Sequence, residues 1–141
     1  MNWLPDINLW LALTFSGHTH HRSALDWFEQ AEPLSCAFCR MTQEGFLRLA
    51  CNPSVFKSDA LSLREAWSAY DTLCDDERVV FLAEPVGTES EWRIWTATGA
   101  FSPKLWNDAY LAAVSKTAGL KLVSFDRGFG QFTGLEWVAL G

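Results

Sequence analysis

Hydrophobic and polar positions along the chain alternate between short apolar runs and patterns with a helical repeat. The apolar runs predict strands at residues 1–5, 33–38, 79–85, 120–125 and 136–140. The helical patterns predict helices at residues 7–13, 21–31, 41–50, 60–76, 89–99 and 102–118. Strands separated by helices favour a parallel sheet covered on both faces. We therefore expect an α/β fold, a three-layer α/β/α sandwich with a mainly parallel, roughly five-stranded sheet.

Length and composition are consistent with one domain over residues 1–141. Hydrophobic residues make up 49% of the chain, which is enough for a substantial core and excludes a disordered chain. No apolar run approaches the roughly 18 residues of a membrane-spanning helix, and the start of the chain lacks the basic region of a secretory signal. We therefore expect a cytoplasmic protein without a membrane segment, in which the four cysteines stay reduced.

An aspartate interrupts the apolar pattern of the helix predicted at residues 102–118. Ser102 suits its N-terminal cap, Pro103 its first turn and Gly119 its end. Asp108 then stands one turn from Leu105 on a face that is otherwise apolar. An acid on such a face needs a partner, so Asp108 is a candidate functional residue.

Three further acids occupy positions related to the ends of predicted strands. Asp6 directly follows the first strand and Asp126 follows the strand at 120–125, so both emerge at the same edge of a parallel sheet. Glu44 lies early in the helix after the second strand, and Asp108 lies early in the helix before the fourth. The four carboxylates are expected to converge on one pocket.

Each of these acids also has a purely structural interpretation. Asp6 could cap the following helix, and Glu44 could be a favourable charge in the first turn of its helix. Asp126, which precedes "RGF", could form an Asx-turn. The joint pattern, rather than any one acid, points to a shared site.

Convergence of carboxylates has an electrostatic consequence. Two like charges about 4 Å apart repel by about 4 kcal/mol at an effective dielectric constant of 20. Such acids must share protons or bind cations, and oxygen-only ligands suit Mg²⁺ or Mn²⁺. A bound ion of this kind lowers the pKa of a water and neutralises a phosphate oxygen. The pattern therefore predicts a divalent-metal site.

The segments that carry these acids resemble the PIN-domain ribonucleases, and most of all the VapC-type toxins of bacterial toxin–antitoxin pairs. The resemblance rests on "PDIN", "RMTQEGFLRLACNP", "NDAYLAAV" and "SFDRGF", in this order, and it extends over nearly the whole chain. It implies a metal-dependent endoribonuclease toxin that hydrolyses RNA phosphodiester bonds. It also implies a small antitoxin protein that blocks the pocket, and a homodimer.

The resemblance assigns roles to particular residues. It implies that Asp6, Asp108 and Asp126 hold Mg²⁺, for which Mn²⁺ would substitute, and that Glu44 orients the attacking water or completes the coordination. The supporting residues that it implies are Asn8, Thr42 and Ser124. Gly128 stands where some members carry an acid or an amide, which puts a second metal ion in doubt.

Charge and aromatic content refine these expectations. The formal net charge of −6 excludes a broad nucleic-acid-binding surface but allows a local basic rim. Lys104 and Arg127, each close in sequence to a site acid, are candidates for substrate phosphate contacts, with ordinary ion pairs as the alternative. Eight tryptophans suggest aromatic surface for a partner. Candidates for an apolar dimer interface are Trp10, Trp27 and Phe28.

Other motifs fit less well. Cys36 and Cys39 have redox or metal spacing, but no second such pair exists, and buried thiols are the simpler interpretation. "HTHH" at 18–21 could bind a transition metal or simply form a polar entry to the next helix. A haloacid-dehalogenase-like phosphatase needs a second Asp where Asn8 stands, and a receiver domain needs an Asp after the third strand, which ends in "AEPVGTE". A PIN scaffold that holds no metal and only binds a partner is a further alternative.

Overall fold

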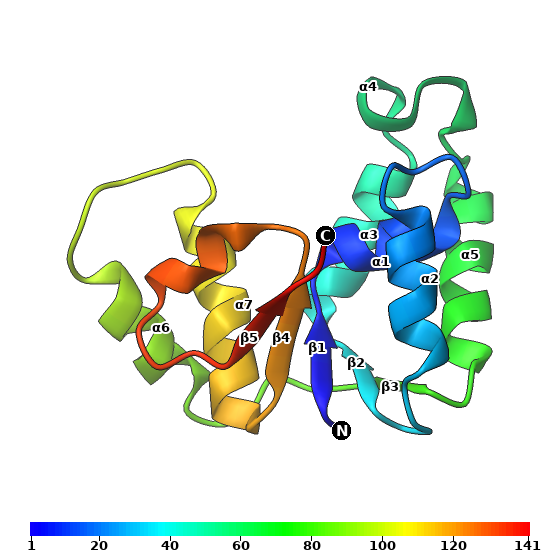
Figure 1. The fold of residues 1–141 in the computed structure, drawn as a ribbon. Helices are drawn as coiled ribbons and strands as arrows, with labels where there is room; N and C mark the ends of the chain where they lie inside the picture. The colour runs from blue at the N-terminus through cyan, green and yellow to red at the C-terminus, as the bar shows by residue number, and fades with distance from the viewer.

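A computed structural model describes residues 1–141 and contains one five-stranded sheet in the order β3-β2-β1-β4-β5 (Figure 1). All four strand pairings are parallel. The strands are β1 (Trp3–Pro5), β2 (Cys36–Phe38), β3 (Val79–Phe81), β4 (Lys121–Ser124) and β5 (Trp137–Ala139). The predicted α/β class with a parallel, five-stranded sheet is confirmed.

Seven α-helices and two short 3₁₀ helices connect the strands. The helices are α1 (Ile7–Thr14), α2 (His21–Glu29), α3 (Arg40–Ala50), α4 (Pro53–Phe56), η1 (Lys57–Asp59), α5 (Leu63–Asp75), α6 (Thr88–Thr96), α7 (Leu105–Ala118) and η2 (Arg127–Gln131). Figure 1 shows α1, α2, α3 and α5 on one side of the sheet and α6 and α7 on the other. The sheet therefore forms the middle of three layers.

Strand β2 shows how the sheet divides the core. Cys36 and Phe38 pack into a cluster with side chains of α1, α2, α3 and α5, and Ala37 between them packs into a second cluster with α7. Successive side chains of a strand point to opposite faces, so a continuous apolar run supplies both clusters. Both faces of the central strands are buried, as expected for a parallel sheet.

Strand β3 differs from its prediction. The run at 79–85 was expected to form a buried strand, but only Val79–Phe81 pairs with β2, and Phe81 is exposed. The reason is topological, because β3 is an edge strand and the chain turns away after it.

Two helix starts also differ from their predictions. Asn52 and Pro53 end α3 as expected, but they also cap and open the short helix α4, which the sequence pattern did not predict. Helix α7 begins at Leu105 with Lys104 at the cap, instead of being capped by Ser102. The Ser102 carbonyl accepts a hydrogen bond from the Leu105 N–H, so Pro103 and Lys104 form a turn before the helix.

The end of β1 is tied to β4 rather than to β2. Pairing with β4 runs from Trp3 to Pro5, whereas pairing with β2 is registered only at Trp3. Pro5 has no N–H to donate, which is consistent with the short pairing on the β2 side. The Asp6 N–H donates to the Val123 carbonyl at 2.9 Å, so the residue that follows β1 remains fixed to β4.

None of the helices has both the length and the apolar content that crossing a bilayer requires. All four cysteines are free thiols, and Cys36 and Cys39 are buried. These two residues are core side chains, as their simpler interpretation predicted.

Candidate active site

A cavity of about 270 Å³ lies beyond the carboxyl ends of β1 and β4. The chain leaves β1 for β2 on one side of it and later returns to β4 on its other side. Sites of open parallel sheets form at such a switch point. The polar side chains that line the cavity are Asp6, Asn8, Lys104, Asn107, Asp108 and Asp126.

The Ser124 hydroxyl connects the ends of the two strands. This buried side chain donates to Asp6 Oδ2 at 2.7 Å and accepts from the Asp126 backbone N–H at 2.9 Å. Asn8 Nδ2 donates to the same hydroxyl at 3.2 Å. The Asn8 side-chain oxygen accepts from the Phe125 N–H at 3.4 Å. Asn8 and Ser124 thus occupy the positions expected of supporting residues.

Asp6 and Asp126 both cap helices while they line the cavity. Asp6 Oδ1 accepts from the Ile7 N–H at 2.7 Å at the start of α1, and Asp126 Oδ1 accepts from the Gly128 N–H at 2.8 Å at the start of η2. Each carboxylate leaves its second oxygen for other partners. The capping interpretation and the shared-site interpretation therefore hold together.

Asp108 reaches the cavity from the opposite layer of helices. It lies in the first turn of α7, half-buried, next to the fully buried Ala109. Burial raises the pKa of the Asp108 carboxyl to about 6, the nearby Lys104 ammonium opposes this, and the carboxylates of Asp6 and Asp126 add to it. The acid on the apolar face thus lies where the sequence pattern predicted, facing other acids.

Lys104 supplies the positive charge at this site. Its ammonium forms an ion pair with Asp126 Oδ2, and this hydrogen bond is the main cause that raises the pKa of Lys104. The same hydrogen bond, with that from Gly128, lowers the pKa of Asp126. Asp6 has no such partner, and burial raises the pKa of its carboxyl despite the hydrogen bonds from Ser124 and Ile7. The negative charge of Asp126 is therefore compensated by an ion pair, whereas those of Asp6 and Asp108 are not.

The three aspartates suit a hard divalent cation in their chemistry. They present only oxygen donors, and the Lys104 ammonium already binds among them as a cation. No group of three acidic, histidine or cysteine side chains stands close enough to hold one ion directly. Mg²⁺ usually retains several of its waters, so the three aspartates would hold it at least partly through water.

Glu44 does not line this cavity. It lies three residues after Met41, which does, but its exposed carboxylate accepts from Arg48 Nε at 3.2 Å. Together with Leu47 and Trp67 it borders a separate apolar cavity between α3 and α5. Of the four acids expected to converge, the structure brings three together.

The remaining predicted site residues have other surroundings. Thr42 is fully buried, and its hydroxyl accepts from the Cys39 N–H at 3.0 Å, so it caps the start of α3 rather than facing the cavity. Arg127 is exposed and does not line the cavity. Asn107 does line it and was not predicted, although its place directly before Asp108 in "WND" was a usable signal.

The "HTHH" segment does not form a metal site. His18 Nδ1 accepts from the His20 N–H at 3.0 Å, and His21 Nδ1 contacts the Ala12 carbonyl at 2.7 Å. The His20 ring stacks on Phe125 with 4.3 Å between centroids, which places a histidine nearer to the acids than the sequence separation indicated. These contacts fit the polar entry to α2.

Two of the three predicted interface aromatics are interior. Trp10 is fully buried and stacks on Phe38, and Phe28 is buried in the same cluster. Trp27 is half-buried and packs edge-to-face on Trp3. The prediction that Trp10 and Phe28 form a dimer interface is wrong, because they complete the core between α1, α2 and β2.

Comparisons with known proteins identify the family of this chain. The PIN-domain family model matches residues 4–135. Ribonuclease VapC41 of Mycobacterium tuberculosis H37Rv is 45% identical over 138 residues, which covers 94% of each protein. The crystal structure of VapC20 from the same species, a Sarcin-Ricin loop cleaving toxin, matches with a TM-score of 0.70 at 18% identity, over 98% of this chain and 99% of that chain.

A toxin–antitoxin complex from Klebsiella pneumoniae contains a chain with a TM-score of 0.60 at 18% identity, covering 98% of this chain and 97% of that chain. The two structural matches show the fold, and the family model and the 45% identity show the family. This chain, with three aspartates around the cavity at the switch point of its sheet, belongs to the PIN-domain family and, within it, to the VapC ribonucleases.

Proposed function

We propose that the chain is a Mg²⁺-dependent endoribonuclease toxin that hydrolyses RNA phosphodiester bonds at the cavity beyond β1 and β4. The observation that carries this proposal is the joint placement of Asp6, Asp108 and Asp126 around that cavity. The pKa values of Asp6 and Asp108 are raised, as expected for carboxylates whose negative charge a bound cation would stabilise. Mn²⁺ is expected to replace Mg²⁺, because both take oxygen ligands.

The three aspartates would hold the ion, directly or through water. When bound, it would neutralise phosphate charge and lower the pKa of a water. Ser124 fixes one oxygen of Asp6 and the backbone of Asp126, so these two acids keep their orientation when no ion is bound. Lys104 would exchange Asp126 for the substrate phosphate as the partner of its ammonium when RNA binds.

Glu44 is proposed to join the site when the ion and substrate are bound, by orienting the water or completing the coordination. Its ion pair with Arg48 lies on an exposed helix surface. Such pairs contribute only about 0.3–0.5 kcal/mol, so Glu44 leaves Arg48 at little cost. Met41, one turn earlier on α3, lines the cavity, so the carboxylate has a short way to move.

The partners proposed for this chain are RNA, a small cognate antitoxin and a second copy of itself. The Klebsiella relative was solved as a toxin–antitoxin complex, which supports the antitoxin. The homodimer no longer rests on Trp10 and Phe28, since both are interior. Static light scattering of the purified chain at micromolar concentration should give twice the monomer mass, and a monomer mass would remove the dimer from this proposal.

Cleavage of a mixed RNA pool tests the function. The protein should cut RNA with Mg²⁺ or Mn²⁺, stop in EDTA, and resume when the ion is restored. The products should carry a 5′-phosphate and a free 3′-hydroxyl, because an external water attacks the phosphorus and the 3′-oxygen leaves as the P–O3′ bond breaks. A single 2′-deoxy substitution at the cleavage site should not prevent cutting.

Matched variants connect the cleavage to the site. Asp6→Asn and Asp108→Asn keep the shape of the side chain but remove its charge, and should reduce cleavage by at least about a hundredfold, in line with loss of a metal ligand's support. Glu44→Gln should reduce cleavage by a smaller factor. Products with 2′,3′-cyclic phosphate ends, or cutting that persists in EDTA with the purified protein, would contradict the proposed function.

A further inference from the structure

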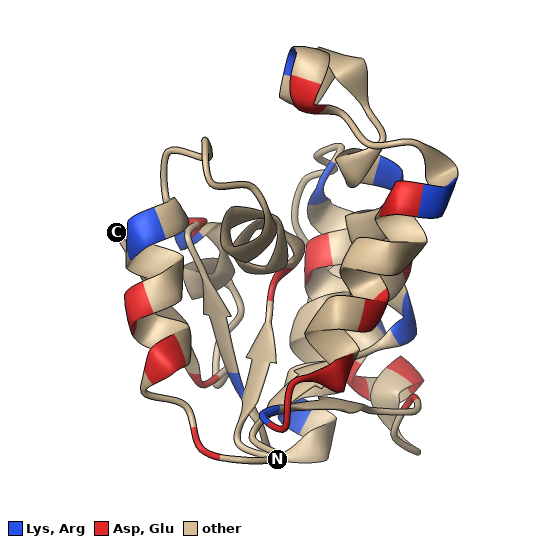
Figure 2. Ribbon diagram, turned by 90° about the vertical axis from the view of Figure 1, so that its right-hand side faces the viewer, with Lys and Arg blue, Asp and Glu red and all other residues tan.

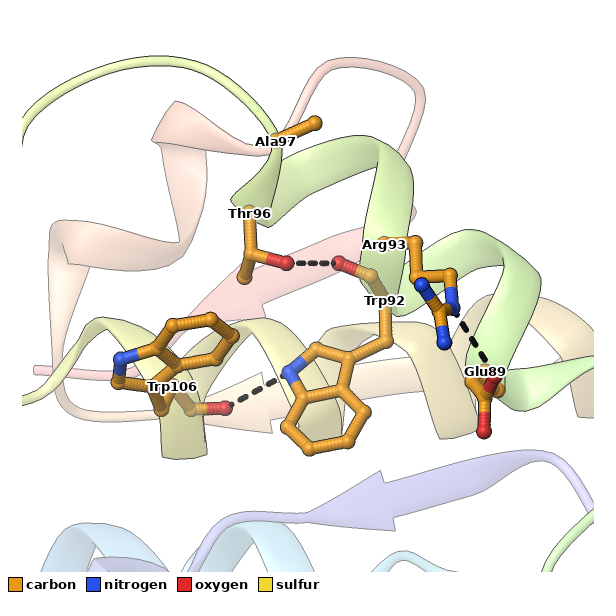
Figure 3. Close-up of a pocket in the computed structure, with 6 residues that line it drawn as sticks. All are labelled: Glu89, Trp92, Arg93, Thr96, Ala97 and Trp106. Atoms are coloured by element: carbon orange, nitrogen blue, oxygen red, sulfur yellow. Dashed lines mark hydrogen bonds and ion pairs between the residues drawn. The ribbon is translucent and has the colours of Figure 1, made fainter.

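A second cavity, of about 420 Å³, lies between α6 and α7 (Figure 3). Its walls include the indole rings of Trp92 and Trp106, and its rim includes Glu89 and Arg93. Trp92 Nε1 donates to the Trp106 carbonyl at 3.0 Å, and the Trp92 ring also packs edge-to-face on Tyr110 at 5.2 Å. Trp92 is therefore fixed, whereas Trp106 is 51% exposed and packs edge-to-face on Trp92 with 6.0 Å between centroids. Figure 3 shows the two indoles side by side along the cavity.

The first turn of α7 lies between this aromatic cavity and the acidic one. Lys104, Asn107 and Asp108 line the acidic cavity, and Trp106 lines the aromatic one. Two residues along a helix are about 200° apart, so Trp106 and Asp108 point to opposite sides of the same turn. A helix with its side chains is about 10 Å across, and this is the span that a strand held at Asp108 would cross to place a neighbouring nucleotide at Trp106.

The charge of the chain limits how it can bind RNA. With a net charge of −6 and acids at the site, phosphate contacts alone supply little affinity. Unpaired bases stack on aromatic side chains for about 1–3 kcal/mol each, regardless of the protein's charge. An exposed tryptophan near the acidic cavity, such as Trp106, can supply this missing affinity.

The rim of the aromatic cavity also suits a base better than an apolar peptide. Arg93 Nε donates to Glu89 Oε2 at 2.9 Å in an exposed pair that is cheap to break. Released, the two side chains offer donors and an acceptor to the polar edge of a base. The Thr96 hydroxyl is already engaged with the Trp92 carbonyl at 2.7 Å and fixes the end of α6.

We propose that the cavity between α6 and α7 is a subsite for one unpaired base of the RNA substrate, which stacks on Trp106 next to the nucleotide held at Asp108. This inference rests on the proposed function, because it requires RNA at the acidic cavity. Trp106 acts as a binding residue for the substrate and takes no part in the chemistry.

Fluorescence anisotropy with a labelled single-stranded RNA of random sequence tests the subsite. The measurement uses the Asp108→Asn protein in EDTA, so that cleavage is suppressed during the titration. Adding Trp106→Ala should weaken binding by about tenfold, the equivalent of 1.4 kcal/mol within the range for base stacking. Trp106→Phe should retain most of the affinity, because it keeps an aromatic face. Ile94→Ala, an exposed apolar residue of α6 outside the cavity, is the control and should bind as the parent does.

A blunt-ended RNA duplex gives a second control, because it offers no unpaired base. Trp106→Ala should leave its weak binding unchanged. Equal single-strand affinity of the Trp106→Ala and parent proteins, with unchanged circular dichroism, would overturn the subsite.

Kinetics of the protein that retains Asp108 give a further test. In this wild-type background, Trp106→Ala should raise KM for single-stranded RNA and leave kcat nearly unchanged. If the wild-type protein cuts RNA with Mg²⁺ but Trp106→Ala changes neither affinity nor KM, only the subsite fails. If it cuts no RNA at all, the proposed function fails.

Discussion

Asp108 and Asp126 face the same cavity, but their charges are compensated to different degrees. Asp126 accepts hydrogen bonds from Lys104 and from the Gly128 N–H, and these lower the pKa of its carboxyl. Asp108 is half-buried, and burial raises the pKa of its carboxyl to about 6, with a further contribution from Asp6 and Asp126. Without a bound cation, ionised Asp108 therefore opposes folding, which is the usual cost of preparing a cation site.

Asp108→Asn should stabilise the metal-free protein above pH 6. The carboxyl has an ordinary pKa of 3.8 and a folded-state pKa of about 6, so its ionisation costs stability fully above pH 6 and not at all below 3.8. We expect the substitution to raise the free energy of unfolding by about 1 kcal/mol near neutral pH, a value reduced for partial solvent access. Urea unfolding in EDTA measures this difference, which should close as the pH falls from 6 to 4. Asp71→Asn, on the exposed surface of α5, is the control. A variant less stable than wild type at neutral pH would show that Asp108 has a structural role instead.

At the scale of elements, the periodicity of the sequence predicted the strands and helices that bury an apolar face. It missed the short helix and the helix start that local turns determine. All five strands and six of the seven α-helices lie within or next to their predicted ranges, because apolar runs and helical repeats record which faces are buried. Helix α4 was missed, since it has only four residues and only Phe56 among them packs against the core. The start of α7 was misplaced because Ser102 and Pro103 match a cap pattern but form the preceding turn.

Site residues were predictable where the backbone alone positions them. Asp6 and Asp126 follow strands β1 and β4, so the sheet fixes their place. The position of the Glu44 carboxylate depends on its side-chain rotamer. Its spacing of four residues from Arg48 predicts an ion pair along the helix, and this pair competes with a position of the carboxylate at the acidic cavity. Trp10 and Phe28 show the opposite limit, because composition does not separate aromatic residues of a core from those of an interface.

The packing of α1 against α3 offers a prediction at this scale. A Cβ atom on Gly45 would lie 2.2 Å from Ile7 Cδ1 and 3.0 Å from Ile7 Cγ1, and Ile7 lines the acidic cavity next to Asp6. Gly45→Ala gains about 1 kcal/mol of helix propensity, but overpacking costs about 1–3 kcal/mol, so we expect it to destabilise the protein slightly.

Ile7→Val removes the clashing Cδ1 atom and reverses this balance. In that background Gly45→Ala should stabilise the protein by up to about 1 kcal/mol, because the helix propensity remains and most of the clash is gone. A double-mutant cycle from urea unfolding measures the coupling between the two positions. An equal effect of Gly45→Ala in both backgrounds would mean that Ile7 moves aside freely and that the α1–α3 contact does not fix the site.

For the molecule as a whole, charge decides how the proposed RNA substrate is attracted. The chain carries 17 acidic and 11 basic residues, and Figure 2 shows the basic ones scattered over the helical layers instead of gathered on one face. Broad electrostatic steering of RNA is therefore weak. Recognition must depend on a few groups, namely Lys104 at the acidic cavity, the exposed Arg127 directly after Asp126, and Trp106 at the aromatic cavity.

RNA binding should accordingly depend only weakly on salt. Each phosphate contact with single-stranded RNA contributes a slope of about −0.7 to the logarithm of the binding constant against the logarithm of salt concentration. Contacts from Lys104 and Arg127 alone predict a slope near −1.4, or about a sevenfold loss of affinity for a fourfold rise in salt.

Anisotropy with the Asp108→Asn protein in EDTA over a range of KCl concentrations measures this slope. Lys104→Ala should make it shallower by about 0.7, whereas Trp106→Ala should lower the affinity at every salt concentration and leave the slope unchanged, because stacking releases no counterions. A slope much steeper than that of two contacts would reveal a basic surface that the distribution of charges does not predict.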